Sequence, residues 1–208
     1  MGSARRLPMF PLGTVLMPFA HLPLHIFEPR YRALTRDCLA GDREFGVVLI
    51  ERGGEVGGGD TRFGVGTVAR IVQAVELPDG RWLLDAVGTD RFRILRWLAD
   101  DPYPLAEVEL LEEPGAGPVA AELRDAVERL LRQVLALQVE LGFSAPSATL
   151  DLDEEPSRAA YQAAVLSPLG PMDTQLLLEE AGPEDRLRRL GGLLEEARDV
   201  LTRRMAEG

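Results

Sequence analysis

Two histidines and one carboxylate lie close enough in the sequence to suggest a metal site. His21 and His25 are four residues apart and Glu28 follows three residues later, a spacing that would put all three on one face of a helix. Pro23 lies between the histidines and prevents that helix. In an extended chain the two rings share a side but lie about 13 Å apart, too far to share a metal bound at about 2 Å. We therefore expect no metal site and no other cofactor, and interpret the histidines as hydrogen-bonding residues of a sheet.

An activated nucleophile is also missing from the sequence. Cys38 is the single cysteine, and it shares a helical stripe with Tyr31 and Leu34, which predicts a buried and inert thiol. No Gly-x-Ser-x-Gly segment is present. All 23 basic residues are arginine, so a phosphate-loop lysine, a Ser-Lys dyad and a Schiff-base lysine are excluded. We predict no catalytic residue and expect that the chain is not an enzyme.

A glycine pair resembles part of a dinucleotide-binding motif. Gly64, Gly66 and Ala69 fit the pattern G-x-G-x-x-G/A, and Asp85 lies at a suitable distance downstream. That motif requires a tight turn from a strand into a helix, whereas the residues that follow here are rich in valine and isoleucine and favour another strand. We interpret the pair as glycines at the start of a strand.

The densest set of polar side chains is Glu28, Arg30, Tyr31 and Arg32. In a structural interpretation, Glu28 satisfies the free amides at the start of a helix, and the arginines pair with nearby acids. In a functional interpretation, these side chains lie on the rim of a binding groove. The sequence does not distinguish the two.

The better candidates for ligand contact precede that set. Met17 and Phe19 lie on a bent segment stiffened by Pro18, and a glycine-rich loop follows at residues 53–60. Met17 and Phe19 fit a hydrophobic core, but if they are exposed they offer the adaptable apolar contact that promiscuous polypeptide binding uses. The candidate polypeptide-binding residues are therefore Met17, Phe19, His21, Glu28 and Arg30.

The first half of the chain reads as strands with one helix. Short apolar segments with alternating or β-branched residues predict strands, Pro29 suits the first turn of a helix, and Pro78-Asp79-Gly80 predicts a tight turn. Phe92 and Ile94 alternate with arginines before the apolar face switches, which predicts a bulge near Ile94. We expect strands at 7–12, 15–27, 45–51, 63–77, 82–97 and 105–111, and a helix at 29–40.

The second half reads as helices after a Pro-Gly boundary at residues 114–118. Apolar residues from Leu123 to Leu141 step by four and three, which predicts one buried stripe along a helix, and Ser157 suits the cap of a shorter helix. The predicted fold class is α+β, a β-barrel over residues 1–113 followed by a helical bundle over residues 118–208. We expect helices at 118–142, 157–166, 171–181 and 183–205.

Charge and composition limit the partners and the compartment. The net charge is −11, and arginines and acids sum to +2 over residues 1–99 and to −13 over residues 100–208. This balance repels phosphate backbones and argues against nucleic acid as a partner. Prolines interrupt the uncharged stretch at residues 7–27, so we expect no membrane segment. A lone cysteine and the absence of a cleavable leader pattern predict a reducing, cytoplasmic location.

Several longer segments are familiar. Residues 7–12 (LPMFPL), 23–32 (PLHIFEPRYR), 66–71 (GTVARI) and 77–80 (LPDG) resemble, in order and spacing, the N-terminal substrate-binding domain of Lon proteases. The resemblance continues at residues 91–94 (RFRI) and 173–177 (DTQLL). It implies a PUA-like β-barrel followed by a helical bundle, and a role in engaging unfolded or tagged polypeptides.

The chain also departs from that family. Lon proteases continue into an ATPase and a Ser-Lys protease, whereas this sequence ends at Gly208 and contains no lysine. We expect a stand-alone relative of the domain, and our leading hypothesis is a non-enzymatic module that binds unfolded or extended polypeptides. The alternatives are an RNA-binding PUA-like protein and a small-molecule sensor with a pocket between the halves. The resemblance leaves open whether the chain serves a protease, acts alone or binds another ligand, and its oligomeric state.

Overall fold

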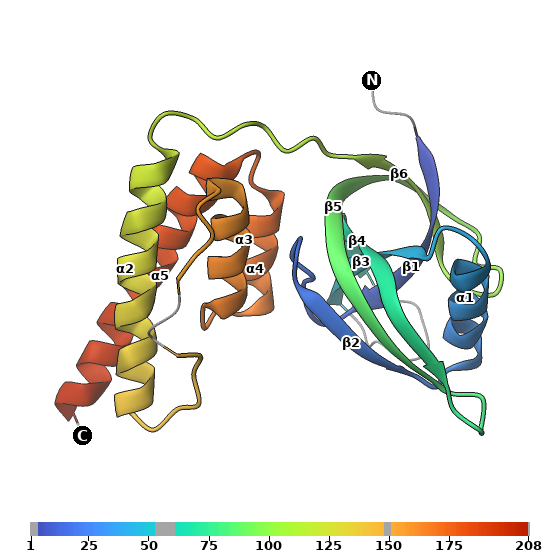
Figure 1. The fold of residues 1–208 in the computed structure, drawn as a ribbon, viewed down its shortest axis with the longest axis horizontal. Helices are drawn as coiled ribbons and strands as arrows, with labels where there is room; N and C mark the ends of the chain where they lie inside the picture. Colours follow the sequence, from blue (N-terminus) through green and yellow to red (C-terminus); the bar gives the residue numbers. More distant parts are fainter. Residues whose placement is uncertain (1–3, 53–60, 148–150, 208) are drawn as a thin grey trace. The chain divides into compact units, whose positions relative to one another are not determined.

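A computed structural model describes residues 4–52, 61–147 and 151–207. Contacts divide the chain into two compact units, Met1–Glu112 and Glu113–Gly208. The first unit is a sheet with one helix and the second is helical, which confirms the α+β class (Figure 1). Over the described ranges, no helix combines the length and the apolarity needed to cross a membrane. The glycine-rich loop proposed as a ligand candidate, at residues 53–60, lies outside the described residues.

The described elements follow the expected order along the chain. They are β1 (Arg5–Leu12), β2 (His21–Ile26), α1 (Pro29–Ala40), β3 (Glu44–Arg52), β4 (Thr61–Glu76), β5 (Trp82–Leu98), β6 (Leu105–Leu110), α2 (Ala120–Glu140), α3 (Pro156–Leu166), α4 (Pro171–Glu179) and α5 (Pro183–Glu207). Strand β2 is shorter than the expected segment at 15–27, because residues 13–20 form a loop and turns.

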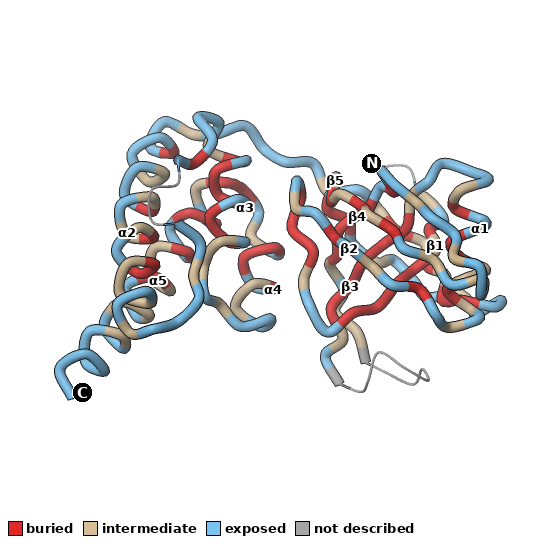
Figure 2. Tube along the Cα trace, turned by 60° about the horizontal axis from the view of Figure 1, so that its bottom comes forward, coloured by how far each residue is buried: buried red, intermediate tan, exposed pale blue. Residues whose placement is uncertain are grey.

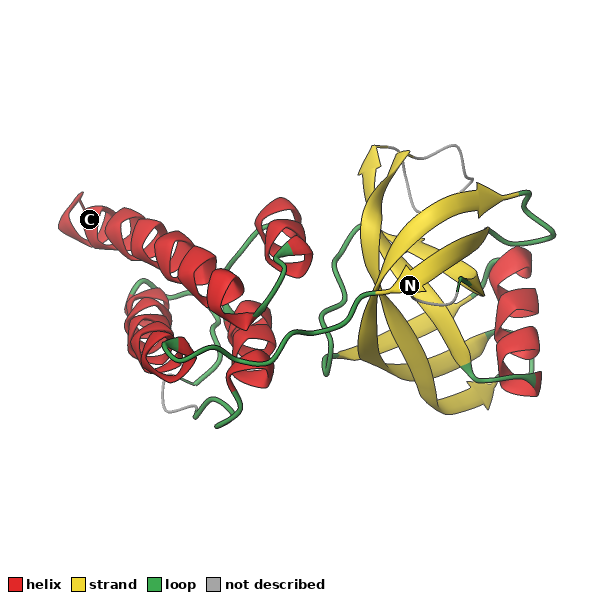
Figure 3. Ribbon diagram, turned by 90° about the horizontal axis from the view of Figure 1, so that it is seen from above, coloured by secondary structure: helices red, strands yellow, loops and turns green. Residues whose placement is uncertain are grey.

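The sheet closes into a barrel through the long strand β5. Strand β4 pairs with Trp82–Arg93 of β5, β2 pairs with Trp82–Val87, and β6 pairs with Phe92–Leu98. Strand β6 then pairs with β1, which pairs with β3, and β3 pairs with β4. Figure 3 shows the strands wrapped around a common axis with α1 beside them. Among the described residues, β2 pairs only with β5, so it is the one strand left with an unpaired edge along its length.

The barrel core is formed by alternate residues of these strands together with one face of α1. Tyr31 of α1 stacks on Phe10 with ring centroids 4.1 Å apart, and Phe10 also contacts the ring of Phe45. Figure 2 shows buried positions along the strands and on one face of α1. Each large apolar side chain that is fully buried contributes about 1.5 to 3 kcal/mol to folding.

Local features of the barrel follow from turn chemistry. Gly80 has a φ of 78° and the Asp79 carboxylate accepts a hydrogen bond from the Arg81 amide, so the expected turn between β4 and β5 is confirmed. The bulge expected near Ile94 is also confirmed, because the β5–β6 register shifts between Ile94 and Arg96.

The helical unit differs from expectation in two details. The buried face of α2 differs from the expected stripe. Within that stripe, Val127 and Val134 are buried but Leu130 is only half-buried. Leu131 and Leu135, which lie outside the stripe, are buried instead. The buried face is rotated because α2 packs against both α5 and α3.

The cap of α3 was predicted on the wrong residue. The Glu155 side chain accepts hydrogen bonds from the amides of Ser157 and Arg158, so Glu155 caps the helix. The Ser157 hydroxyl instead donates to the Glu113 carboxylate, 2.9 Å away. Ser157 therefore ties the start of this unit to α3.

Candidate functional site

Strand β2 presents alternate side chains to the two sides of the barrel wall. Leu22 and Ile26 are buried in the core, whereas His21, Pro23 and His25 are exposed on the outer face. The four-residue spacing thus places both histidines on the same side of an extended strand, as expected. The His21 ring lies 3.2 Å from the Asp85 carboxylate of the neighbouring strand, which makes a surface pair rather than a metal site.

The outer face of β2, β5 and β4 carries a row of exposed side chains, two of them aliphatic and one an imidazole ring. Backbone register places His25 opposite Leu83, and Leu83 opposite Val75, so the three lie side by side across three strands. Leu83 and Val75 are 46% and 45% exposed. Phe27 (54% exposed) meets the His25 ring edge-on with centroids 6.3 Å apart, and Val72 is exposed at the bulge of β4. We call His25, Phe27, Val72, Val75 and Leu83 the outer apolar patch.

A small cavity adjoins this patch between β1 and β2. It has a volume of about 110 Å³ and an apolar lining. Its walls come from the end of β1, from β2 and from the start of α1: Phe10, Leu12, Leu24, His25, Ile26, Phe27, Glu28 and Tyr31. Since His25 and Phe27 belong to both the cavity and the patch, the two form one continuous surface.

Glu28 and Arg30 lie beside this cavity and bind each other. The Arg30 Nε donates to the Glu28 carboxylate at 3.1 Å, and the Arg30 guanidinium lies 4.5 Å from the centroid of the Tyr31 ring. The Glu28 side chain makes no hydrogen bond to the helix amides, so the cap expected in the structural interpretation is wrong. The expected pairing of the arginines with local acids is confirmed for Arg30.

Met17 does not belong to the exposed surface. It is 1% exposed, and its backbone carbonyl packs against Gly88, where a Cβ atom would approach within 2.3 Å. The Thr67 hydroxyl holds the same segment by donating to the Leu16 carbonyl at 2.6 Å. The candidate role of Met17 in direct polypeptide contact is therefore wrong for the folded chain, because this segment is anchored inside the barrel.

Phe19 has the opposite environment. It is 51% exposed and has a φ of 66°, an unusual backbone conformation for a bulky residue. Its amide donates to the Gly88 carbonyl at 2.8 Å, which fixes this turn at the entrance to β2. Two exposed phenylalanines, Phe19 and Phe27, thus lie just before and just after the free-edged strand.

The other sequence candidates have structural roles. Cys38 is buried and its thiol donates to the Glu44 carbonyl; burial, with a smaller effect of the Asp37 charge, raises its pKa to about 12. Gly66 lies inside strand β4, where a Cβ atom would approach the Val47 carbonyl within 2.2 Å. The glycine pair therefore belongs to a strand, as expected, and its second member allows close packing of the barrel wall.

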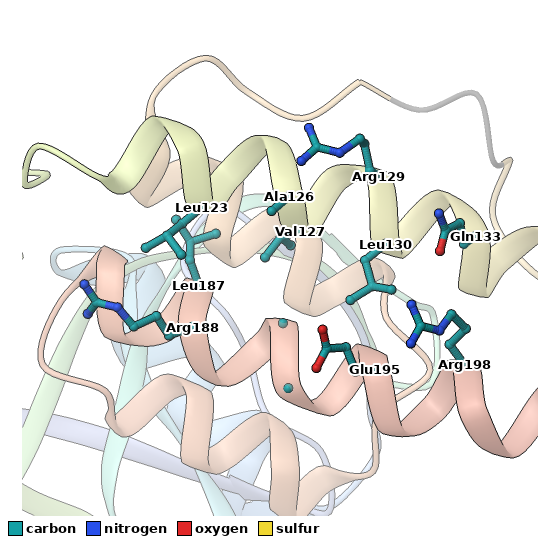
Figure 4. A pocket seen from close by; sticks show the side chains of 12 residues that line it. Leu123, Ala126, Val127, Arg129, Leu130, Gln133, Leu187, Arg188, Glu195 and Arg198 are labelled. Atoms are coloured by element: carbon teal, nitrogen blue, oxygen red, sulfur yellow. The ribbon is translucent and has the colours of Figure 1, made fainter.

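The helical unit contains a larger open groove between α2 and α5. Its volume is about 500 Å³, and Figure 4 shows its lining side chains. Gly191 and Gly192 of α5 contribute no side chain, and the apolar part of the lining consists of Leu123, Ala126, Val127 and Leu130 of α2 and Leu187 of α5. The groove includes charged residues on its lining: Arg129, Arg188, Glu195 and Arg198. Of these, Arg188 pairs with Glu184 and Asp185, and Arg198 pairs with Asp199.

Sequence reasoning missed the outer apolar patch, although one signal was present. Leu83 and Leu84 are consecutive in a strand, so both faces of β5 are apolar at that point, and one of those faces is the solvent side. The alignment of Leu83 with His25 and Val75 depends on the pairing register of three strands, which the sequence does not display.

Comparison with known proteins gives one consistent match. A family model described as the ATP-dependent protease La (LON) substrate-binding domain covers residues 6–196. Lon protease 2 of Herpetosiphon aurantiacus is 33% identical over an alignment of 205 residues, and the match covers 94% of this chain and 24% of that protein. The chain therefore spans about a quarter of the length of the curated relatives it matches.

Solved structures agree with this match. A Lon N-terminal domain protein from Xanthomonas campestris is 30% identical, with a TM-score of 0.65 over 89% of this chain and 96% of that one. The N-terminal domain of a Mycobacterium avium complex Lon protease is 21% identical, with a TM-score of 0.67 over 92% and 98% of the two chains, and supports the fold.

Proposed function

The chain belongs to the LON substrate-binding domain family, and from this premise we propose that it is a polypeptide-recognition module without catalytic chemistry of its own. Its ligands are unfolded or extended polypeptides, and a protease is the partner that such a module serves. The outer apolar patch and the adjoining cavity are the contact surface.

The observation that carries this proposal is the exposed row His25–Leu83–Val75. Three strands of a rigid barrel hold these side chains in register, with Phe27 at one end. An exposed apolar surface that the barrel does not bury is available for apolar side chains of another chain. Such contacts depend on area rather than on a fixed sequence, at about 25 cal/mol per Å² removed from water. This property suits recognition of many different unfolded clients.

The electrostatics of the barrel do not favour RNA. Several of its arginines are paired with carboxylates: Arg70 with Glu44, Arg81 with Asp79, Arg96 with Glu107 and Arg36 with Glu76. Phosphate binding needs arginine or lysine charge that is available to the backbone. The cavity between β1 and β2 gives little support to a small-molecule sensor, because its volume of about 110 Å³ is below the roughly 300 to 1,000 Å³ of typical ligand pockets.

A matched pair of variants tests the proposal. Leu83→Ser with Val75→Ser removes two apolar members of the patch, and Leu95→Ser changes an equally exposed leucine (50%) further along β5. Binding is measured by fluorescence anisotropy with a reduced and alkylated model protein that cannot refold. We expect the double variant to lose about 1 to 2 kcal/mol of binding free energy, roughly fivefold to thirtyfold in affinity.

The control decides how the result is interpreted. All three positions are exposed, so thermal stability is expected to stay within about 0.5 kcal/mol of the wild type. Leu95→Ser is expected to bind like the wild type. Equal weakening by both variants, or a wild-type chain that binds no unfolded protein, would contradict the proposal.

A further inference from the structure

Strand β2 leaves one row of backbone groups without partners in the described part of the chain. The Gly88 amide donates to the Ala20 carbonyl at 2.9 Å, and this bond fixes the phase of the ladder between β2 and β5. Bonded and non-bonded pairs alternate in an antiparallel ladder, so Leu22, Leu24 and Ile26 bond to β5. The amide and carbonyl groups of the alternate residues point away from β5, to the free edge.

The residue types on this free edge agree with that phase. The edge residues are His21, Pro23 and His25, and proline occupies the middle position, where the ladder with β5 requires no N–H group. The edge thus offers carbonyl groups of all three residues and the amides of the two histidines. Within the described ranges, no backbone bond from these residues runs to any other element.

Apolar features lie at both ends of this edge and beside it. Phe19 precedes β2 and Phe27 follows it, and both expose about half of their surface. The 110 Å³ cavity lies between the second half of β2 and the end of β1, with room for about one aliphatic side chain. An extended chain that follows β2 would therefore meet an aromatic ring at each end and one apolar cavity.

We propose that an extended segment of the client binds along the free edge of β2 as an added strand, with backbone hydrogen bonds to His21, Pro23 and His25. This proposal rests on the proposed function and specifies the class of client. The client is a non-helical segment with free backbone amides and alternating apolar residues, one of which fills the cavity between β1 and β2. Backbone hydrogen bonds to β2 then add to the contacts of the outer apolar patch. They tolerate different client sequences, because every non-proline residue carries the same backbone groups.

Pro23 favours a client over a second copy of this chain. In a two-fold pairing of β2 with β2 centred on Pro23, both strands would lack the same amide donor at the centre. A client strand supplies its own N–H group to the Pro23 carbonyl. Proline in an edge strand also disfavours pairing between copies of the same protein.

Backbone-methylated peptides test the added strand without changing the protein. The probe is an octapeptide of alternating leucine and threonine, together with two isomers N-methylated at either three leucines or three threonines. In an added strand, the amides of only one alternating set face β2. We expect one isomer to bind at least tenfold more weakly than the parent and the other to bind within about threefold of it.

The outcomes separate this inference from the proposed function. The added strand would be wrong if both methylated isomers bound like the parent peptide, or if both lost affinity equally, while Leu83→Ser still weakened binding of the parent. The polypeptide-binding function would then remain. A parent peptide and an unfolded model protein that both fail to bind would overturn the function itself.

A variant of the protein provides the second test. His25→Pro removes one edge amide without touching the ladder to β5, and His25→Ala removes the ring but keeps the amide. We expect His25→Pro to weaken the parent peptide at least fivefold relative to His25→Ala, with the same melting temperature. Equal affinities would contradict the proposal. If sedimentation equilibrium shows a dimer that His25→Pro dissociates, and the chain binds no peptide, the free edge of β2 binds a second copy of the chain. That result would also overturn the proposal.

Discussion

Arg186, which has no exposed surface, donates a 2.7 Å hydrogen bond from Nη1 to Oε1 of Glu113. Its other nitrogens donate to the backbone carbonyls of Leu177 and Glu180, and its guanidinium lies 4.0 Å from the centroid of the Tyr161 ring. A buried arginine is tolerated when each donor group has a partner, as here. This pair ties the segment that enters the helical unit to α3, α4 and α5.

We predict that Arg186→Met destabilises the helical unit by about 3 kcal/mol, because it removes the buried positive charge beside the Glu113 carboxylate and the donors to the Leu177 and Glu180 carbonyls. The measurement is urea unfolding followed by circular dichroism. Arg188→Met is the control: Arg188 pairs with Glu184 and Asp185 at the surface of the same helix, and its removal should cost less than about 1 kcal/mol. Equal costs for the two variants would rule out this role of Arg186.

The network at Glu113 shows where sequence reasoning stops. The acids that follow Pro183 and the periodicity of the leucines predict α5 and its start, because both are local properties of the chain. A partner 73 residues away is not local, so the burial of Arg186 was not predicted. The same holds for Ser157, a residue type that often caps helices. Its hydroxyl donates to the Glu113 carboxylate, and the side chain of Glu155 caps the helix.

The rotated face of α2 gives a second prediction. Leu131 is fully buried and Leu130 lines the open groove, so Leu131→Asp should destabilise the helical unit by several kcal/mol, whereas Leu130→Asp should cost clearly less. Thermal unfolding of the two variants, read at 222 nm, measures the difference. A larger loss for Leu130→Asp would mean that the stripe expected from the sequence is the true core face.

The glycine pair of β4 gives a third prediction. Gly66→Ala should destabilise the barrel by about 2 to 3 kcal/mol, because the new methyl group would meet the Val47 carbonyl within 2.2 Å and the Phe92 ring within 2.7 Å. Gly64→Ala is the matched control, since no atom lies within 4 Å of its Cβ position, and it should be close to neutral. Denaturant midpoints distinguish the two. A tolerant Gly66→Ala would contradict the close packing of β3, β4 and β5.

The fourth prediction concerns alkaline pH. Burial raises the pKa of Cys38 from about 9 to about 12, so the unfolded chain releases its thiol proton at a lower pH than the folded chain does. The free energy of unfolding must therefore fall as the pH rises from about 9 towards 12, by up to about 1.4 kcal/mol per pH unit. The absence of lysine removes the usual competing titration in this range.

Cys38→Ala isolates this effect. Urea unfolding at pH 8, 9, 10 and 11 should give a shallower decline for the variant than for the wild type. Tyr103, whose pKa is raised mainly by burial and by its hydrogen bond to Asp37, contributes to the decline in both proteins. The charge of the Cys38 thiolate raises the pKa of Tyr103 further, so part of the difference between the two curves comes through Tyr103. Parallel curves for the two proteins would show that the Cys38 thiol is open to solvent.

Only part of the candidate site could be predicted from the sequence, because some of its features depend on contacts between residues far apart in the chain. The pairing of Arg30 with Glu28 follows from residue types and short spacing, whereas the sequence left the exposure of Phe19 open. The burial of Met17 depends on the close approach of its carbonyl to Gly88, which is 71 residues away, and no local pattern reports it. Likewise, the patch exists only once β2, β5 and β4 are aligned in register.

The most direct test of polypeptide binding at this patch is a methyl NMR titration of the wild-type chain with the unlabelled, reduced and alkylated model protein. The account predicts the largest shift changes at the methyl groups of Leu83, Val75 and Val72, and small ones at Leu123 and Leu130 in the α2–α5 groove. Changes confined to Leu123 and Leu130, with Leu83 and Val75 unmoved, would contradict it.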